Sequence, residues 1–187
     1  MSIDDDSEAT FRPSPWVSRH AALAAAGGHA LDLAAGAGRH ARWLLERGYH
    51  VVALDIDTSG LADLAGVEGI EIVAADLEGG QPWPLAERQF DLVIVANYLF
   101  RPILADIGHS MAPGGVLIYE TFAAGNEQFG RPRNPDHLLR PGELLEAFGK
   151  VLQVVAYEHG IETEPSPAVR QRLVAVADDE LRPFPSR

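Results

Sequence analysis

Five short apolar runs recur along the first two thirds of the chain, and they constrain the fold more than any other feature. The runs lie at residues 29–34, 50–55, 70–75, 90–96 and 116–120. Strands that are apolar on both faces are typical of parallel sheets with helices on each side. The pattern therefore predicts a doubly wound α/β fold.

Segments with helical spacing separate most of these runs. A helix is expected from Ser14-Pro15, where serine caps the helix and proline occupies its first turn, to Gly27. Residues 38–47 carry an apolar stripe at helical spacing, and a short helix is expected between the second and third runs. A further helix with Leu99, Ile103, Ile107 and Met111 on one face precedes the fifth run, and another spans 141–148. Two β-like segments, 151–157 and 169–177, close the pattern and bring the strands to seven.

A glycine-rich turn follows the first run directly. Residues 36–38 read Gly-Ala-Gly, so a ligand can approach bare backbone there. Acidic residues mark the same region: Asp32 lies in the first run, Asp55 ends the second and Asp76 follows the third. The carboxyl ends of parallel strands share one edge of the sheet, where α/β folds bind ligands. The three carboxylates are therefore expected to gather at one ligand site.

The charge of these residues bears on the kind of ligand. Residues 36–41 also fit the dinucleotide pattern G-x-G-x-x-G/A, but Asp32 beside the turn would repel a pyrophosphate. Asp55 is placed to accept hydrogen bonds from ribose hydroxyls, and Asp76 from an adenine amine. A cationic adenosine cofactor without phosphate, S-adenosyl-L-methionine (SAM), fits best. An NAD-dependent oxidoreductase is the alternative.

The turn also resembles a known family motif. Residues 32–38, Asp-Leu-Ala-Ala-Gly-Ala-Gly, are similar to the D/E-x-G-x-G-x-G motif of the class I SAM-dependent methyltransferases, with Ala34 at the first glycine. The resemblance implies a Rossmann-like sheet of order 3-2-1-4-5-7-6 with an antiparallel strand seven. Within the class, the chain resembles the small tellurite-resistance-type methyltransferases through residues 31–33, 36–39 and Pro141-Gly142-Glu143-Leu144. The cofactor contacts expected are Trp16, Asp32, Ala34, Gly36, Gly38, Asp55, Ile56, Asp76, Leu77 and Asn97.

The methyl acceptor is expected beyond the ends of the fourth and fifth runs. Asn97-Tyr98 follows the fourth run but lacks both prolines of the N-P-P-Y/F sequence of amino-directed nucleic-acid methyltransferases, which disfavours that chemistry. A polar segment at 123–140 carries several arginines and suits an anionic or oxyanionic acceptor, such as tellurite. The expected substrate residues are Tyr98, Arg101, Phe122, Arg131, Arg133 and Arg140, and the candidate catalytic residues are Glu120, His137 and Tyr98.

Composition narrows the remaining function classes. The chain has 187 residues, which suits a single domain, expected at 14–180 between a disordered acidic tail at 1–13 and a C-terminal tail at 181–187. It has no cysteine, no metal-binding spacing of its histidines and no apolar run long enough for a membrane. A net charge of −12 disfavours nucleic acid, and a cytoplasmic location is expected.

The sequence thus predicts a SAM-dependent methyltransferase that acts on a small-molecule substrate. A SAM-binding regulatory protein without turnover, or an RNA or protein methyltransferase, is the alternative. The oligomeric state does not follow from the sequence.

Overall fold

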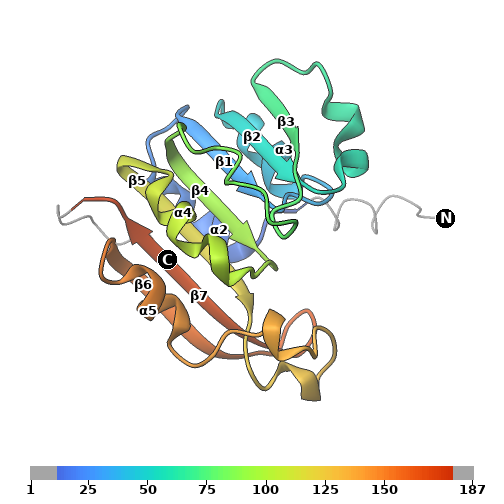
Figure 1. Cartoon of the computed structure of the whole chain (residues 1–187), viewed down its shortest axis with the longest axis vertical. Coiled ribbons are helices and arrows are strands. Elements are labelled where there is room, and N and C mark those ends of the chain that lie inside the picture. The colour runs from blue at the N-terminus through green and yellow to red at the C-terminus, as the bar shows by residue number, and fades with distance from the viewer. Residues whose placement is uncertain (1–11, 179–187) are drawn as a thin grey trace.

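A computed structural model describes residues 12–178, within which seven strands form one sheet (Figure 1). The order is β3-β2-β1-β4-β5-β7-β6. The first five strands pair in parallel, and β7 is antiparallel to both β5 and β6. These findings confirm the predicted fold and strand order. The strands are β1 His29–Leu33, β2 His50–Asp55, β3 Ile70–Ala74, β4 Phe90–Ala96, β5 Met111–Phe122, β6 Gln153–Glu162 and β7 Ala168–Val176.

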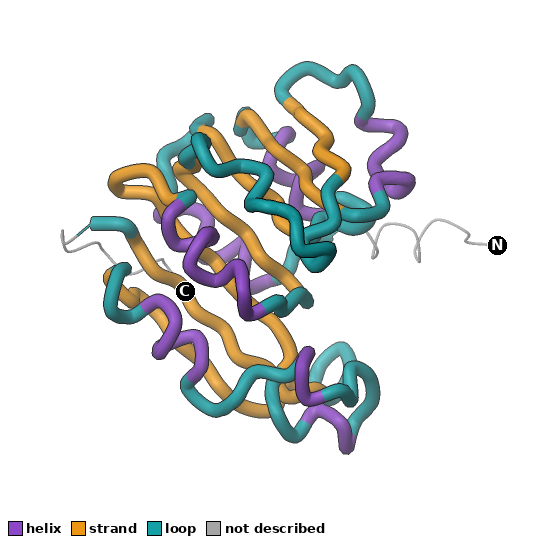
Figure 2. The backbone as a smooth tube through the Cα atoms, viewed as in Figure 1, coloured by secondary structure: helices purple, strands orange, loops and turns teal. Residues whose placement is uncertain are grey.

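Short helices connect the strands (Figure 2). The α-helices are α2 Pro15–His20, α3 Arg39–Leu45, α4 Leu104–His109 and α5 Glu143–Phe148. Turns of 3-10 helix are η1 Ala21–Leu23, η2 Thr58–Leu64, η3 Arg101–Ile103, η4 Asn126–Gln128 and η5 Pro135–His137. None of the helices between residues 12 and 178 is long and apolar enough to cross a membrane. The predicted tail at 181–187 and residues 1–11 of the predicted N-terminal tail lie outside the described residues, and the predicted domain bounds stay a prediction.

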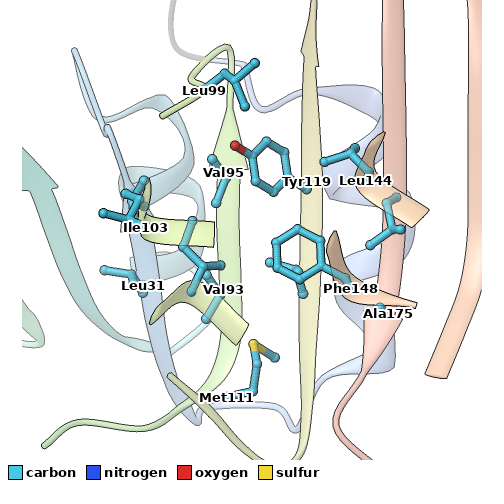
Figure 3. Packing of buried hydrophobic residues seen from close by; sticks show 14 of the residues in the cluster. Leu31, Val93, Val95, Leu99, Ile103, Met111, Tyr119, Leu144, Phe148 and Ala175 are labelled. Carbon is cyan, nitrogen blue, oxygen red and sulfur yellow. The ribbon is translucent and has the colours of Figure 1, made fainter. Parts of the chain in front are cut away.

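Each face of the sheet has its own buried core. On one face, Leu31, Val93 and Tyr119 pack with residues of α4 and α5, including Phe148 (Figure 3). On the other face, alternate residues of the same strands, such as Ile94, pack with α2 and α3. Because successive strand residues point to opposite faces, both sets must be apolar. This explains the continuous apolar runs in the sequence.

The first helix is shorter than predicted. It is α-helical only to His20 and continues as a 3-10 turn to Leu23, after which Ala24 is extended with ψ 158°. The chain must then turn into β1, and a side chain on Gly28 would lie 2.5 Å from a carboxylate oxygen of Asp91. The alanines after His20 favour a helix, but the packing of Gly28 against Asp91 at the start of β1 outweighs this preference.

The helix predicted to include Met111 ends earlier, at His109, and Met111 begins β5. The backbone N–H of Phe90 donates to the carbonyl of Ser110 at 2.8 Å, which starts the pairing of β4 with β5. Gly115 follows within the strand, where a Cβ atom would lie 2.6 Å from the Phe90 carbonyl oxygen. The proline and glycines predicted to end a helix therefore form the irregular beginning of a strand.

Candidate active site

The glycine-rich turn is held from behind by Asp32. This buried carboxylate accepts a hydrogen bond from the backbone N–H of Ala41, 2.9 Å away, in the first turn of α3. It also lies 3.7 Å from Nδ1 of His40, whose Nε2 accepts the N–H of Ser14 at 3.3 Å. Asp32 thus joins β1 to α3. A direct contact of Asp32 with a cofactor stays a prediction.

The backbone of the turn is left-handed at three positions. Gly36 has φ 56° and Gly38 has φ 74°, and a Cβ atom on Gly38 would lie 2.4 Å from a methyl carbon of Leu61. Ala34 has φ 56°, in the same region, although it carries a side chain. This is the position at which the sequence departs from the family motif, and it places strain in the turn.

Asp55 links the turn to the end of β2. One carboxylate oxygen accepts the N–H of Gly36 at 2.7 Å, and the other accepts the N–H of Asp57 at 3.0 Å. A carboxylate has about four acceptor positions, so acceptor capacity remains for two ribose hydroxyls.

A cavity of about 380 Å³ opens beside these residues. Its volume falls within the usual range for small-molecule sites. It brings together six residues predicted from the sequence, namely Ala34, Asp55, Ile56, Asp76, Leu77 and Tyr98. The other lining residues are Leu54, Ala75 and Glu78. The wall thus combines apolar side chains with three carboxylates and contains no lysine or arginine, so it suits a ligand without phosphate.

Two lining residues show how the cavity is built. Ile56 is 68% exposed, an unusual position for a large apolar side chain, and offers a surface on which an adenine ring can pack. Asp76 accepts the N–H of Glu78 at 2.9 Å, which fixes the turn after β3. The residues present therefore fit the adenosine part of SAM.

Tyr98 lies between this cavity and the end of β5. Burial raises the pKa of its phenol, and the nearby carboxylate of Glu78 raises it further. The hydroxyl is therefore protonated at neutral pH and acts as a hydrogen-bond donor. The backbone carbonyl of Tyr98 accepts the hydroxyl of the buried Tyr119 at 3.0 Å, which holds the chain after β4 in place.

Trp16 contributes a buried and unsatisfied donor. Its side chain is buried against the sheet, its ring lies 4.1 Å from that of His20, and the Arg172 guanidinium lies 6.0 Å from it. Within residues 12–178 its indole Nε1 has no hydrogen-bond partner. A buried N–H without a partner costs free energy, which a ligand oxygen could remove.

On the acceptor side, Asn97 is held by residues from two neighbouring strands. It has φ 57°, and its backbone N–H donates to the Glu120 carbonyl at 2.9 Å. Its side-chain Oδ1 accepts a hydrogen bond from Nη1 of Arg170 on β7 at 2.7 Å. The same guanidinium lies 4.3 Å from the ring centre of Phe122. Asn97 and Phe122, both predicted site residues, therefore contact the same arginine.

Glu120 is buried and paired with a second arginine of β7. Nε of Arg172 lies 3.2 Å from a carboxylate oxygen of Glu120, and Arg172 also bonds Glu158 and Glu162. Burial opposes the charge of Arg172, but these carboxylates raise its pKa above the ordinary value. The ion pair engages one of the two carboxylate oxygens of Glu120.

Arg101 is used mainly to hold the chain together. Its Nε and Nη2 donate to the two oxygens of Glu143 at 2.6 and 3.0 Å, while Nη1 and Nη2 donate to the carbonyls of Asp136 and Leu138. Burial would raise the pKa of Glu143, yet the bonds from Arg101 and from the Arg140 N–H together lower it. Four of the five N–H groups of Arg101 are thus engaged, which leaves one for a substrate.

The 123–140 segment is more ordered than the sequence indicates. Its two ends pair with each other and with β7, since Ala123 donates to the Val169 carbonyl and Leu139 to the Phe122 carbonyl. The buried Asn126 accepts the N–H of Val169 at 3.1 Å. Arg131, Arg133, Arg140 and His137 are exposed on this segment, and their predicted roles stay predictions.

Sequence reasoning did not single out Arg170 and Arg172, which contact Asn97 and Glu120 at the ends of β4 and β5 and also bond Glu162. The signal was present: arginines two residues apart on one strand point to the same face. Only the pairing of β7 with β5 shows that this face adjoins Phe122 and Glu120.

Comparisons with known proteins agree with this geometry. Residues 30–115 match a family described as a methyltransferase domain. Among solved structures, TehB from Haemophilus influenzae has a TM-score of 0.66 and 17% identity; the match covers 81% of this chain but only 58% of TehB. A TehB-like SAM-dependent methyltransferase from Corynebacterium glutamicum has a TM-score of 0.65 and 20% identity over 92% of this chain and 94% of its own.

A third structure was solved with ligands in place. The 1,6-didemethyltoxoflavin-N1-methyltransferase from Burkholderia thailandensis, with bound 1,6-didemethyltoxoflavin and S-adenosylhomocysteine (SAH), has a TM-score of 0.67 and 21% identity over 93% of this chain and 80% of its own. No curated protein matches the sequence significantly. These structures share the fold with this chain.

Proposed function

We propose that this chain is a class I SAM-dependent methyltransferase that transfers a methyl group from SAM to a small-molecule acceptor. The observation that carries the proposal is the cavity at the carboxyl ends of β1, β2 and β3. It is lined by carboxylates and apolar side chains without a cation, at the edge where α/β folds bind ligands. A cytoplasmic location is part of the proposal.

The residues of the cavity have distinct roles in this proposal. Asp55 accepts the ribose hydroxyls, and Ile56 and Leu77 pack on the adenine while Asp76 accepts its amine. The cofactor contact expected of Trp16 stays a prediction, since its unpartnered Nε1 is buried and Trp16 does not line the cavity. Gly36 and Gly38 let the backbone approach closely.

SAM supplies an activated methyl group, whose bond to sulfur breaks with both electrons going to sulfur while an acceptor lone pair forms the new bond. The protein has to align the acceptor and exclude water, and no particular side chain is obligatory for this. An acceptor that arrives deprotonated needs no base. Neither Tyr98, whose hydroxyl is protonated, nor Glu120, which is in an ion pair, is then required as a base.

We further propose that the acceptor is anionic, with a tellurite-like oxyanion as one candidate. The resemblance to TehB-like proteins and the arginines on the acceptor side support this choice.

Calorimetric titration tests the cofactor. SAH should bind the protein and raise its melting temperature, whereas NAD should do neither. Asp55→Ala should weaken SAH binding roughly thirtyfold, because loss of hydrogen bonds to a charged group costs about 2 kcal/mol. Asp91→Ala is the matched control, since that carboxylate also accepts a backbone N–H, at 2.7 Å from His29, but at the opposite edge of the sheet. Equal SAH affinity in both variants would contradict the site.

Methyl-labelled SAM tests turnover. The protein should transfer label to a component of a small-molecule cell extract. Binding of SAH without any transfer of label would instead indicate a SAM-binding regulatory protein.

A further inference from the structure

The side chain of Arg170 lies against residues at the carboxyl ends of β4 and β5, namely Asn97 and Phe122. Three contacts fix its position: Nη1 donates to Oδ1 of Asn97 at 2.7 Å, Nε donates to Glu162 at 2.8 Å, and the guanidinium covers the ring of Phe122. The side chain is only 18% exposed. A guanidinium held by a carboxylate, an amide and an aromatic ring is well ordered before any ligand arrives.

These contacts leave one donor group free on each of two bonded side chains. Arginine has donors only, so it fixes Oδ1 of Asn97 toward itself and turns the amide NH2 group away. Neither this NH2 group nor Nη2 of Arg170 has a hydrogen-bond partner within residues 12–178. Both free groups therefore belong to the two side chains that this one hydrogen bond joins, and each is one covalent centre removed from it.

The neighbouring carboxylates are already paired. A hollow of about 340 Å³ beside Arg170 is lined by Arg172, Glu158 and Glu162 among others. Glu162 bonds both arginines and Glu158 bonds Arg172. Paired carboxylates attract a cation less than free ones do, whereas the free donors of Arg170 and Asn97 attract an oxygen anion.

We propose that Nη2 of Arg170 and Nδ2 of Asn97 together bind an oxyanion group of the methyl acceptor. The inference rests on the proposed function, and it replaces the exposed arginines of the 123–140 segment by a partly buried arginine of β7 as the determinant of acceptor charge. A carboxylate of an organic acid and an inorganic oxyanion share this chemistry, and the experiment separates them.

The experiment uses the full chain with methyl-labelled SAM. A metabolite extract is divided on ion-exchange resins into anionic, cationic and neutral pools, and tellurite is tested separately. Label should enter the anionic pool or tellurite. Label that enters only the cationic or the neutral pool would overturn the proposal.

Two variants then test the residues at limiting concentration of the labelled pool or of tellurite. Arg170→Gln should lower the transfer of label at least tenfold. Asn97→Asp should do the same, because it keeps the bond to Arg170 but replaces the donor by a second acceptor. Arg88→Gln is the matched control: it also breaks an arginine–glutamate bond of 2.8 Å, to Glu71, but before β4 and away from the site. Arg88→Gln should transfer label at the wild-type rate.

The affinity for SAH separates this inference from the proposed function. Both site variants should bind SAH within about twofold of wild type. If wild type binds no SAH, the proposed function fails. Suppose that wild type does transfer label. The oxyanion site fails, while the methyltransferase stands, if either folded site variant transfers label as fast as Arg88→Gln. It fails in the same way if either folded site variant loses SAH binding as well. Since Asn97→Asp preserves the shape of its side chain, it decides between these outcomes if Arg170→Gln does not fold.

Discussion

Ala34 offers a sharp test of the strain in the glycine-rich turn. Its φ of 56° lies in the left-handed region, where a non-glycine residue costs about 1–2 kcal/mol. Ala34→Gly should remove that cost. The same change at Ala105, an exposed helical residue of α4 with ordinary backbone angles, should lower stability by about 1 kcal/mol. One substitution should thus act differently at the two positions.

The expected size of the effect at Ala34 follows from three contributions. Relief of strain adds about 1.5 kcal/mol to the free energy of unfolding. The greater freedom of glycine in the unfolded chain removes about 0.7 kcal/mol. Loss of a half-buried methyl group removes about 0.4 kcal/mol. The sum is a gain of about 0.4 kcal/mol, so Ala34→Gly should exceed Ala105→Gly in stability by more than about 1 kcal/mol.

Urea unfolding followed by circular dichroism measures both variants against wild type. Calorimetry with SAH should show that Ala34→Gly binds no more weakly than wild type, because the lost methyl group lines the cavity without donating or accepting a hydrogen bond. If Ala34→Gly is destabilised as much as Ala105→Gly, the backbone at residue 34 is not strained and the reasoning fails.

Three other predictions follow from buried charges and protons. Glu143→Gln should lower the free energy of unfolding by about 2–3 kcal/mol, because it removes a buried carboxylate from its ion pair with Arg101, which is 34% exposed. Asp63→Asn removes an exposed carboxylate from its pair and should change the free energy of unfolding much less. Urea titrations compare the two variants. Burial lowers the pKa of His20 from its ordinary 6.5, so the unfolded chain takes up the proton first and stability falls as the pH drops below about 6.5. His20→Gln should flatten this dependence of stability on pH. An unchanged slope would exclude His20 as its source. Tyr98→Phe should leave the shape of the pH–rate profile between about pH 7 and 10 unchanged, because the raised pKa of the phenol keeps it protonated there, and loss of an alkaline limb would contradict this.

The sheet could be predicted because each parallel strand is apolar on both faces. The bounds of β1, β2 and β4 agree with the apolar runs to within a residue. The predictions were wrong in two places: the alanines after His20 have high helix propensity, and proline with glycine around Pro113 is typical of a helix end. In both places tertiary pairing decides the backbone, because Asp91 crowds Gly28 and the Phe90 carbonyl crowds Gly115.

That Asp55 and Asp76 line one cavity was predictable for the same topological reason, because each follows a parallel strand. The contacts of Arg101 and Arg170 were not. Local sequence around Arg101 predicts a guanidinium available to substrate, yet it is bonded to Glu143, which lies far along the chain. Arg170 lies on an antiparallel strand whose neighbours cannot be read from local patterns.

The position of β7 in the sheet has a consequence for synthesis on the ribosome. Strands β1 to β4, with the glycine-rich turn, leave the ribosome early and can pair among themselves, while β5 keeps one edge open until β7 arrives between it and β6. Arg170 arrives with β7, long after Asn97 has emerged. A nascent chain can therefore assemble the half that carries the glycine-rich turn first, and the half that carries Arg170 is completed only when translation has passed residue 176.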